Sequence, residues 1–200
     1  MKKMNNKGFT LIELLAVITI MGILMMVAIP SVSRTIENAR RDTFADIAHE
    51  YINAVRNGVL ADQIECKLDA SVDKWTVASG TPDGWYYFQL DTTQTSTTDL
   101  MESGGLSPFG NTDMKGCIVW RKNSTTNTAG DLKTKTTYWM RMVDTGQHGF
   151  DTWKGEASIK RAQISTKTTG TAATVGAAPT TSDKPDGTNA VASPKQCRIS

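Results

Sequence analysis

An uninterrupted apolar run near the N-terminus constrains this chain more than any other feature. Between Phe9 and Ile29 the only exceptions to apolar character are Thr10, Glu13, Thr19 and Gly22. A helix of about 20 apolar residues, at roughly 1.5 Å per residue, spans the hydrocarbon core of a bilayer. The run therefore predicts a membrane-spanning helix, and the lysines that precede it favour a cytoplasmic start.

An ordinary secretory signal peptide is the competing interpretation of this segment. It would consist of a basic start, an apolar core and a small-residue cleavage site, for which Ser31–Ser33 is the candidate. The apolar run is longer than the roughly 7 to 15 residues of a signal-peptide core. A charged side chain in the middle of a membrane also costs about 2.5 to 3.5 kcal/mol. Both points favour a retained helix in which Glu13 acquires a partner.

The helical pattern continues beyond Pro30. Residues of one stripe recur at three- and four-residue steps, with most charged side chains away from it. The stripe consists of Val32, Ile36, Ala39, Thr43, Ile47, Tyr51, Ala54 and Val55. The pattern predicts one long helix with a membrane part at 9–30 and an amphipathic part at 31–60. It is expected to be kinked or locally melted at Pro30, because proline removes a helical hydrogen bond.

The stretch KGFTLIELLAVITIMGILMMVAIP, residues 7–30, resembles the N-terminus of type IV pilins and of the pseudopilins of type II secretion and competence systems. The shared features are a basic leader (1–8) ending in Gly8, Phe9 as the first mature residue, Glu13 as the fifth, and a proline near the end of the apolar run. The resemblance implies that a membrane-bound prepilin peptidase cuts between Gly8 and Phe9 on the cytoplasmic face. The same enzyme would methylate the new amine of Phe9.

The resemblance also implies a role for Glu13 in assembly. In a filament its carboxylate would neutralise the Phe9 amine of a neighbouring subunit, so that a charge disfavoured in lipid becomes half of an ion pair. The implied partners are identical or related pilin subunits, the prepilin peptidase, an inner-membrane assembly platform and, before assembly, membrane lipid. The implied location is the cytoplasmic membrane, crossed once with the N-terminus in the cytoplasm, and then a pilus on the cell surface.

Residues 61–165 carry the pattern of a small antiparallel sheet. Runs rich in aromatic and β-branched residues alternate with turn-forming residues, and they cover 74–79, 84–90, 116–122, 136–144 and, more weakly, 157–165. The expected fold class is α+β, a long N-terminal α-helix packed on a pilin-like antiparallel sheet of four or five strands. The expected core includes Trp75, Trp85, Tyr87, Trp120, Tyr138 and Met140.

The composition changes at residue 166. Thr, Ala, Gly, Ser and Pro dominate up to Ser193, which predicts that 166–200 form a low-complexity tail or an exposed loop. Three cysteines lie far apart, and their spacing leaves the pairing open. We favour a disulfide between Cys66 and Cys197, because Cys117 lies in an apolar strand-like run where a buried free thiol is common.

No pattern of catalytic or metal-ligating residues stands out, so neither an enzyme nor a cofactor or metal site is expected. His49 lacks the second histidine of a zinc-protease motif. His148 has no acid or nucleophile pattern nearby, which favours a turn residue over a general base. Loss of a leader ending at Gly8 would remove three lysines from a chain of net charge +2 and leave −1, so charge gives no reason to expect nucleic-acid binding.

Three functions fit these observations. The preferred one is a structural subunit of a type IV pilus that serves adhesion, motility or DNA uptake. The second is a pseudopilin of a type II secretion or competence system, and the third is a binding or enzymatic domain on a simple membrane anchor. Because the N-terminal segment is common to the first two, it does not separate them. The size of the head and its long C-terminal segment favour a surface-exposed pilin.

Overall fold

The structure, a computed structural model, describes residues 10–69, 74–93, 106–110, 112–126 and 130–200. The chain forms two compact units, which divide after Ala39 and are described separately. We call residues 40–200 the head. The elements in chain order are α1 (Leu11–Leu60), β1 (Ile64–Lys67), β2 (Trp75–Val77), η1 (Ala78–Gly80), β3 (Gly84–Asp91), β4 (Met114–Thr126), β5 (Leu132–Asp144), β6 (Gly149–Gly155), η2 (Glu156–Ser158), η3 (Arg161–Gln163), α3 (Ala172–Val175) and β7 (Lys195–Ile199).

Helix α1 contains Pro30 in its interior and remains helical on both sides of it. Proline removes one N–H from the ladder of the preceding turn. Close to it, Ser33 Oγ donates a hydrogen bond to the carbonyl of Ile29 (3.0 Å) and Thr35 Oγ1 donates to the carbonyl of Ser31 (3.1 Å). Such side-chain bonds to the preceding turn are typical of Ser and Thr in helices. The expected melting at Pro30 is therefore absent, and a kink there stays a prediction.

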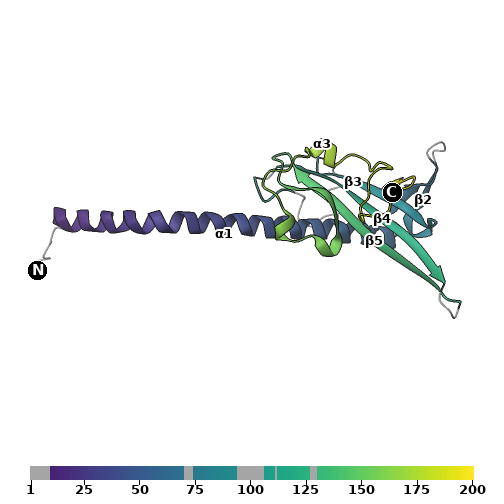
Figure 1. The fold of residues 1–200 in the computed structure, drawn as a ribbon, viewed down its shortest axis with the longest axis horizontal. Helices are drawn as coiled ribbons and strands as arrows, with labels where there is room; N and C mark the ends of the chain where they lie inside the picture. The colour runs from purple at the N-terminus through teal and green to yellow at the C-terminus, as the bar shows by residue number, and fades with distance from the viewer. Residues whose placement is uncertain (1–9, 70–73, 94–105, 111, 127–129) are drawn as a thin grey trace, which may run out of the picture. The chain divides into compact units, whose positions relative to one another are not determined.

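The part of α1 that belongs to the head buries a single stripe of side chains. The stripe consists of Phe44, Ala45, Ile47, Ala48, Tyr51, Ile52, Val55 and Gly58, which recur at three- and four-residue steps. These residues form the main core with one face of the sheet, to which Tyr86, Phe88 and Ile118 contribute. The expected α+β class, a helix packed on a mostly antiparallel sheet, is confirmed (Figure 1).

Seven strands of the described chain form one sheet in the order β2-β1-β7-β3-β4-β5-β6. Only the pair of β3 and β7 is parallel. The four stronger strand predictions correspond to β2, β3, β4 and β5, whereas the weaker one at 157–165 is wrong. That segment forms η2 and η3. Both Ile159 and Ile164 are buried in the main core, and because they are five residues apart, a regular strand would place them on opposite faces.

The prediction of a loose C-terminal tail needs correction. Strand β7 lies between β1 and β3 in the middle of the sheet, and Cys197 on β7 forms a disulfide with Cys66 on β1. Residues 166–194, here called the C-terminal loop, bury their valines, Val175 and Val191. The composition suggested a tail because it offers few large apolar side chains. Hydrogen bonds also tie the loop to the sheet: Gln89 Nε2 donates to the carbonyl of Gly176 and Arg141 Nε to the carbonyl of Val175, both at 2.9 Å.

The C-terminal loop covers the sheet face opposite α1, which we call the outer face (Figure 1). Side chains alternate between faces along a strand, so Trp85 and Tyr87 lie opposite Tyr86 and Phe88. Val191 of the loop packs with Trp85, Cys117 and Val119 in a second apolar cluster, against which Tyr87, Trp139 and Trp153 lie partly buried. Of the expected core residues, Trp120, Tyr138 and Met140 lie in the main core, Trp85 and Tyr87 belong to the outer-face cluster, and Trp75 is half-buried.

Candidate assembly helix

The first unit presents an apolar surface on every side of α1. All its large apolar side chains from Leu11 to Ile29 are exposed, and they occupy successive positions such as Leu14 and Leu15 or Met25 and Met26. A helix that is apolar all round is stable when it is surrounded by lipid or by other helices. By length and composition α1 can cross a membrane, and none of the apolar window is buried within the described chain.

Glu13, the carboxylate of this apolar stretch, is engaged with the first turn of its own helix. The N–H and the hydroxyl of Thr10 both donate hydrogen bonds to Glu13 Oε2, at 2.9 Å and 2.8 Å. In return the N–H of Glu13 donates to Thr10 Oγ1 at 3.3 Å. This reciprocal pair is a capping box. The sequence reasoning missed Thr10, although the spacing T-x-x-E at the start of an apolar run indicates such a cap.

The structure places the other expected site residues as follows. Gly8 and Phe9 lie outside the described residues, so the expected cleavage and methylation site is not described. Pro30 is exposed within α1. The Cα atoms of Cys66 and Cys197 are 4.0 Å apart at their disulfide, which is the pairing favoured from the sequence. Cys117 is a free, buried thiol whose pKa is raised to about 12 by desolvation, and it is therefore unreactive at neutral pH.

A cluster around His148 was also missed from the sequence. His148 Nδ1 lies 2.9 Å from Asp144 Oδ2, and Ser107 Oγ donates to the same oxygen at 2.6 Å. In a catalytic triad the histidine would lie between the acid and the serine, but here both groups bind the acid. The N–H of Phe109 donates to Ser107 Oγ, and the Phe109 ring stacks on the imidazole with centroids 4.4 Å apart. The arrangement fixes the β5–β6 turn against residues 106–110.

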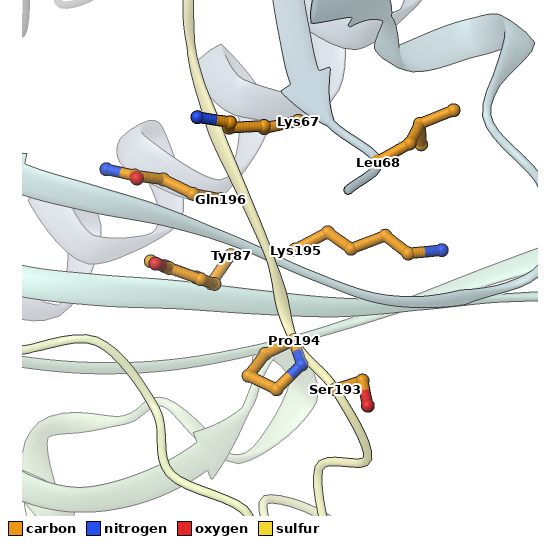
Figure 2. Close-up of a pocket in the computed structure, with 7 residues that line it drawn as sticks. All are labelled: Lys67, Leu68, Tyr87, Ser193, Pro194, Lys195 and Gln196. Atoms are coloured by element: carbon orange, nitrogen blue, oxygen red, sulfur yellow. The ribbon is translucent and has the colours of Figure 1, made fainter. Parts of the chain in front are cut away.

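A hollow of about 430 Å³ lies beside the disulfide, between β1, β3 and β7. Its lining includes Lys67, Tyr87, Lys195 and Gln196 (Figure 2). Figure 2 shows Lys67, Tyr87 and Gln196 ending on one side and the ammonium group of Lys195 on the other, as strand alternation requires. The two lysines therefore do not converge on one anion. Among the described residues, no group of three or more His, Cys, Asp or Glu side chains is placed to hold a metal ion.

Comparison with known proteins identifies the N-terminal segment. Residues 3–29 match the prokaryotic N-terminal methylation motif, which is the hallmark of type IV prepilins and pseudopilins. The match spans Gly8, Phe9, the Thr10–Glu13 pair and the apolar run of α1. No curated protein and no solved structure matches the chain. The chain therefore carries, at its N-terminus, the methylation motif that is found in type IV prepilins and pseudopilins.

Proposed function

We propose that this protein is a structural subunit of a type IV pilus, cleaved after Gly8 and assembled into a surface filament through α1. The observation that carries the proposal is the exposed apolar surface of α1 together with its single acid near the start. Lipid would cover this surface before assembly, and the helices of other subunits would cover it afterwards. The N-terminus would lie in the cytoplasm, because the lysine-rich start is retained there.

The position of Glu13 supports a charge-pairing role. Its carboxylate is exposed and accepts hydrogen bonds from Thr10 alone among the described residues. Cleavage before Phe9 would create an ammonium group one residue before Thr10. A carboxylate and an ammonium group from neighbouring subunits would then neutralise each other inside a helical bundle, where an unpaired charge is costly.

A pseudopilin of a type II secretion or competence system is the alternative, because the N-terminal motif is common to both groups. The ordered C-terminal loop favours the pilus. It covers the outer face of the head with Thr, Ser, Asp and Asn side chains, a polar surface suited to exposure outside the cell. Such a pilus would serve adhesion, motility or DNA uptake.

The processing site is tested by the intact mass of protein extracted from membranes. We expect a mature chain that lacks residues 1–8 and carries one additional methyl group. A signal peptidase acting near Ser33 would instead leave a chain that starts near Arg34. That product would contradict the proposal, because it would lack the whole apolar part of α1.

The pairing role is tested with two variants of one residue. Glu13→Val removes the charge and the cap, whereas Glu13→Gln removes the charge and keeps an acceptor for the capping box. We expect both variants to be inserted and cleaved, and both to be nearly absent from filaments counted by electron microscopy and immunoblotting of sheared material. Normal filament yield with Glu13→Gln alone would show that capping matters and that the charge does not.

A further inference from the structure

A second hollow opens on the outer face, at the end of the sheet away from the disulfide. It is a shallow groove of about 510 Å³, lined by residues of β5, β6, η2, η3 and the C-terminal loop. Its functional side chains are those of Trp139, Trp153, Gln163 and Asp186, and we call this site the tryptophan groove. The groove lies within the head, so binding there does not depend on the role of α1.

The two tryptophans of the groove are held from behind by other side chains. Trp139 packs against Trp85 with ring centroids 5.4 Å apart. The guanidinium group of Arg141 lies 4.5 Å from the centroid of the Trp153 ring, and Trp153 Nε1 donates to Asp183 Oδ1 at 3.1 Å. Both tryptophans remain partly exposed. Aromatic surfaces that are already fixed lose little conformational entropy when a ligand binds.

The space in front of Trp139 depends on a glycine. A Cβ atom on Gly155 would lie 3.6 Å from both Cδ1 and Nε1 of Trp139. The backbone of Gly155 is extended, with φ −65° and ψ 147°, so other residues can adopt the same conformation. The absence of a side chain at this position therefore leaves the edge of the indole ring accessible.

Hydrogen-bonding groups of both kinds surround the rings. The amide of Gln163 is both donor and acceptor, and the carboxylate of Asp186 is an acceptor. Lys154 pairs with Met140 of the main core, so its side chain lies on the other face of the sheet. Asp186 is held in place because its carboxylate accepts hydrogen bonds from the N–H groups of Thr188 and Asn189, at 2.9 Å and 2.6 Å. Burial raises its pKa, but hydrogen bonds from Asn189 and Thr188 outweigh this effect and lower the pKa to about 2. The carboxylate of Asp186 is therefore ionised at neutral pH and would repel an anionic ligand.

We propose that the tryptophan groove binds an uncharged oligosaccharide. A sugar ring has an apolar face of C–H groups, which packs on a flat aromatic surface, and a rim of hydroxyl groups, which needs donors and acceptors together. Trp139 and Trp153 supply the surface, and the polar groups around them supply the rim contacts. A purely apolar ligand would use the rings but would remove the Gln163 amide and the Asp186 carboxylate from water without bonding to them.

A second copy of this chain is the competing occupant. Stable interfaces between proteins bury about 800 Å² on each partner and exclude charged side chains from their centre. The groove has the carboxylate of Asp186 beside its rings. This arrangement favours a hydroxyl-rich ligand over a protein surface, and the two occupants are separated by experiment.

The test uses the full-length protein in a zwitterionic detergent, because an alkyl maltoside would itself present sugar to the groove. The probes are maltoheptaose, cellohexaose and tri-N-acetylchitotriose, with sialyllactose as a charged comparison. Binding is followed by tryptophan fluorescence and calorimetry. We expect saturable binding of at least one uncharged probe. Trp153→Ala should weaken it by about tenfold or more, as loss of a central aromatic contact does.

Trp153→Ala could lose binding because it misfolds, so a second variant, Gly155→Ala, is needed. This variant removes no contact and adds one methyl group beside Trp139. It too should weaken binding. The matched controls lie at the opposite side of the sheet: Trp75→Ala on β2, and Gly80→Ala. Among the described residues, a Cβ on Gly80 would meet Val77 Cγ2 alone, at 3.8 Å. Both controls should bind as the unmodified protein does.

Three results would overturn the proposal. The first is the absence of a saturable response to every uncharged probe at millimolar concentration, or a stronger response to sialyllactose. The second is an equal loss of binding in Trp75→Ala. The third is self-association of the protein, measured by sedimentation without sugar, that Gly155→Ala abolishes, since the groove would then be a contact between copies of this chain.

Discussion

Removal of the disulfide between Cys66 and Cys197 should destabilise the head by about 5 kcal/mol. The bridge joins residues 131 positions apart. In the chain-entropy model, opening a loop of this length restores conformational freedom to the unfolded state worth roughly 5 kcal/mol at 25 °C. The structure adds a second reason for a large effect: β7 lies between β1 and β3, so its release would interrupt the sheet at its centre.

The appropriate variant replaces both cysteines with alanine. Cys66 is fully buried and Cys197 is 4% exposed, so serine would add a hydroxyl group to the core at a cost of about 1 to 3 kcal/mol. Cys117→Ala is the matched control, because it removes one fully buried sulfur atom without opening a cross-link. We expect this control to cost about 1 to 2 kcal/mol.

Guanidinium unfolding followed by tryptophan fluorescence measures the effect, with the protein kept in detergent. All five tryptophans lie in the head, so the signal does not depend on the first unit. With a slope of about 4 kcal/mol per molar guanidinium, a loss of 5 kcal/mol lowers the midpoint by about 1 M. Reducing agent should lower the midpoint of the unmodified protein equally and leave the double variant unchanged. A shift no larger than that of Cys117→Ala would refute the reasoning.

Two further predictions concern Tyr51, which is fully buried in the main core and whose hydroxyl has no hydrogen-bond partner among the described residues. Tyr51→Phe should raise the free energy of unfolding by up to about 1 to 3 kcal/mol, because it removes an uncompensated polar group. Tyr86→Phe is the control and should lower the free energy of unfolding, because the Tyr86 hydroxyl donates a hydrogen bond to the Pro82 carbonyl at 2.5 Å. A loss of stability in Tyr51→Phe in guanidinium unfolding would contradict the first expectation. The second prediction is that the head loses stability at alkaline pH. Desolvation raises the pKa of Tyr51 in the folded head, so the unfolded chain releases this proton first. The free energy of unfolding therefore falls above about pH 10, by up to about 1.4 kcal/mol per pH unit. Unfolding midpoints at about pH 9 and pH 11 check it, and an equal fall in Tyr51→Phe would exclude Tyr51 as the cause.

The parts of the fold that the sequence predicted are those that a local pattern determines. Ile47, Tyr51 and Val55 of the predicted stripe lie on the buried face of α1, whereas the stripe missed Phe44, Ala48 and Ile52 of the same face. Aromatic and β-branched runs between turns predicted β2 to β5. Strands β4 and β5 extend beyond their predicted ends. The additional residues, 123–126 and 132–135, are mostly Thr, Lys, Asn and Ser and pair with one another across the hairpin. Cross-strand pairing, rather than an apolar pattern, determines these ends.

Contacts between distant residues account for the failures. Strand β7 contains a short KQCRI sequence whose neighbours, β1 and β3, lie more than 100 residues earlier in the chain. Cys197 is the single buried residue of these five. The segment therefore has no apolar pattern that distinguishes it from the polar residues around it. The tryptophan groove is similar, because Trp139, Gln163 and Asp186 come from three separate segments. From the sequence, Trp139 and Gln163 were placed in predicted strands and Asp186 in the tail, and Trp153 was not assigned to any element.

Helix α1 shows which features a local pattern can predict and which depend on a second molecule. Glu13 was identified because an acid in an apolar run is unusual. Its contact with Thr10 was missed but was predictable from the sequence, because T-x-x-E at a helix start is a capping box. A pairing with the amine of another subunit involves a second molecule. No pattern within one chain fixes the distance between two helices.

The position of Glu13 explains how an apolar helix can accept an acid before any filament exists. The first four N–H groups of a helix lack intrahelical acceptors, and the helix dipole favours negative charge at the same end. Glu13 has both advantages, because its carboxylate accepts the N–H of Thr10 in the first turn. Thr19 lies deeper in α1, and its hydroxyl is already bonded to the carbonyl of Ala16 at 2.8 Å. A carboxylate at that position would find neither a free N–H nor the end of the dipole. The start of α1 is therefore the favourable place to hold the charge in lipid and, in the filament that we propose, to offer it to a neighbouring amine.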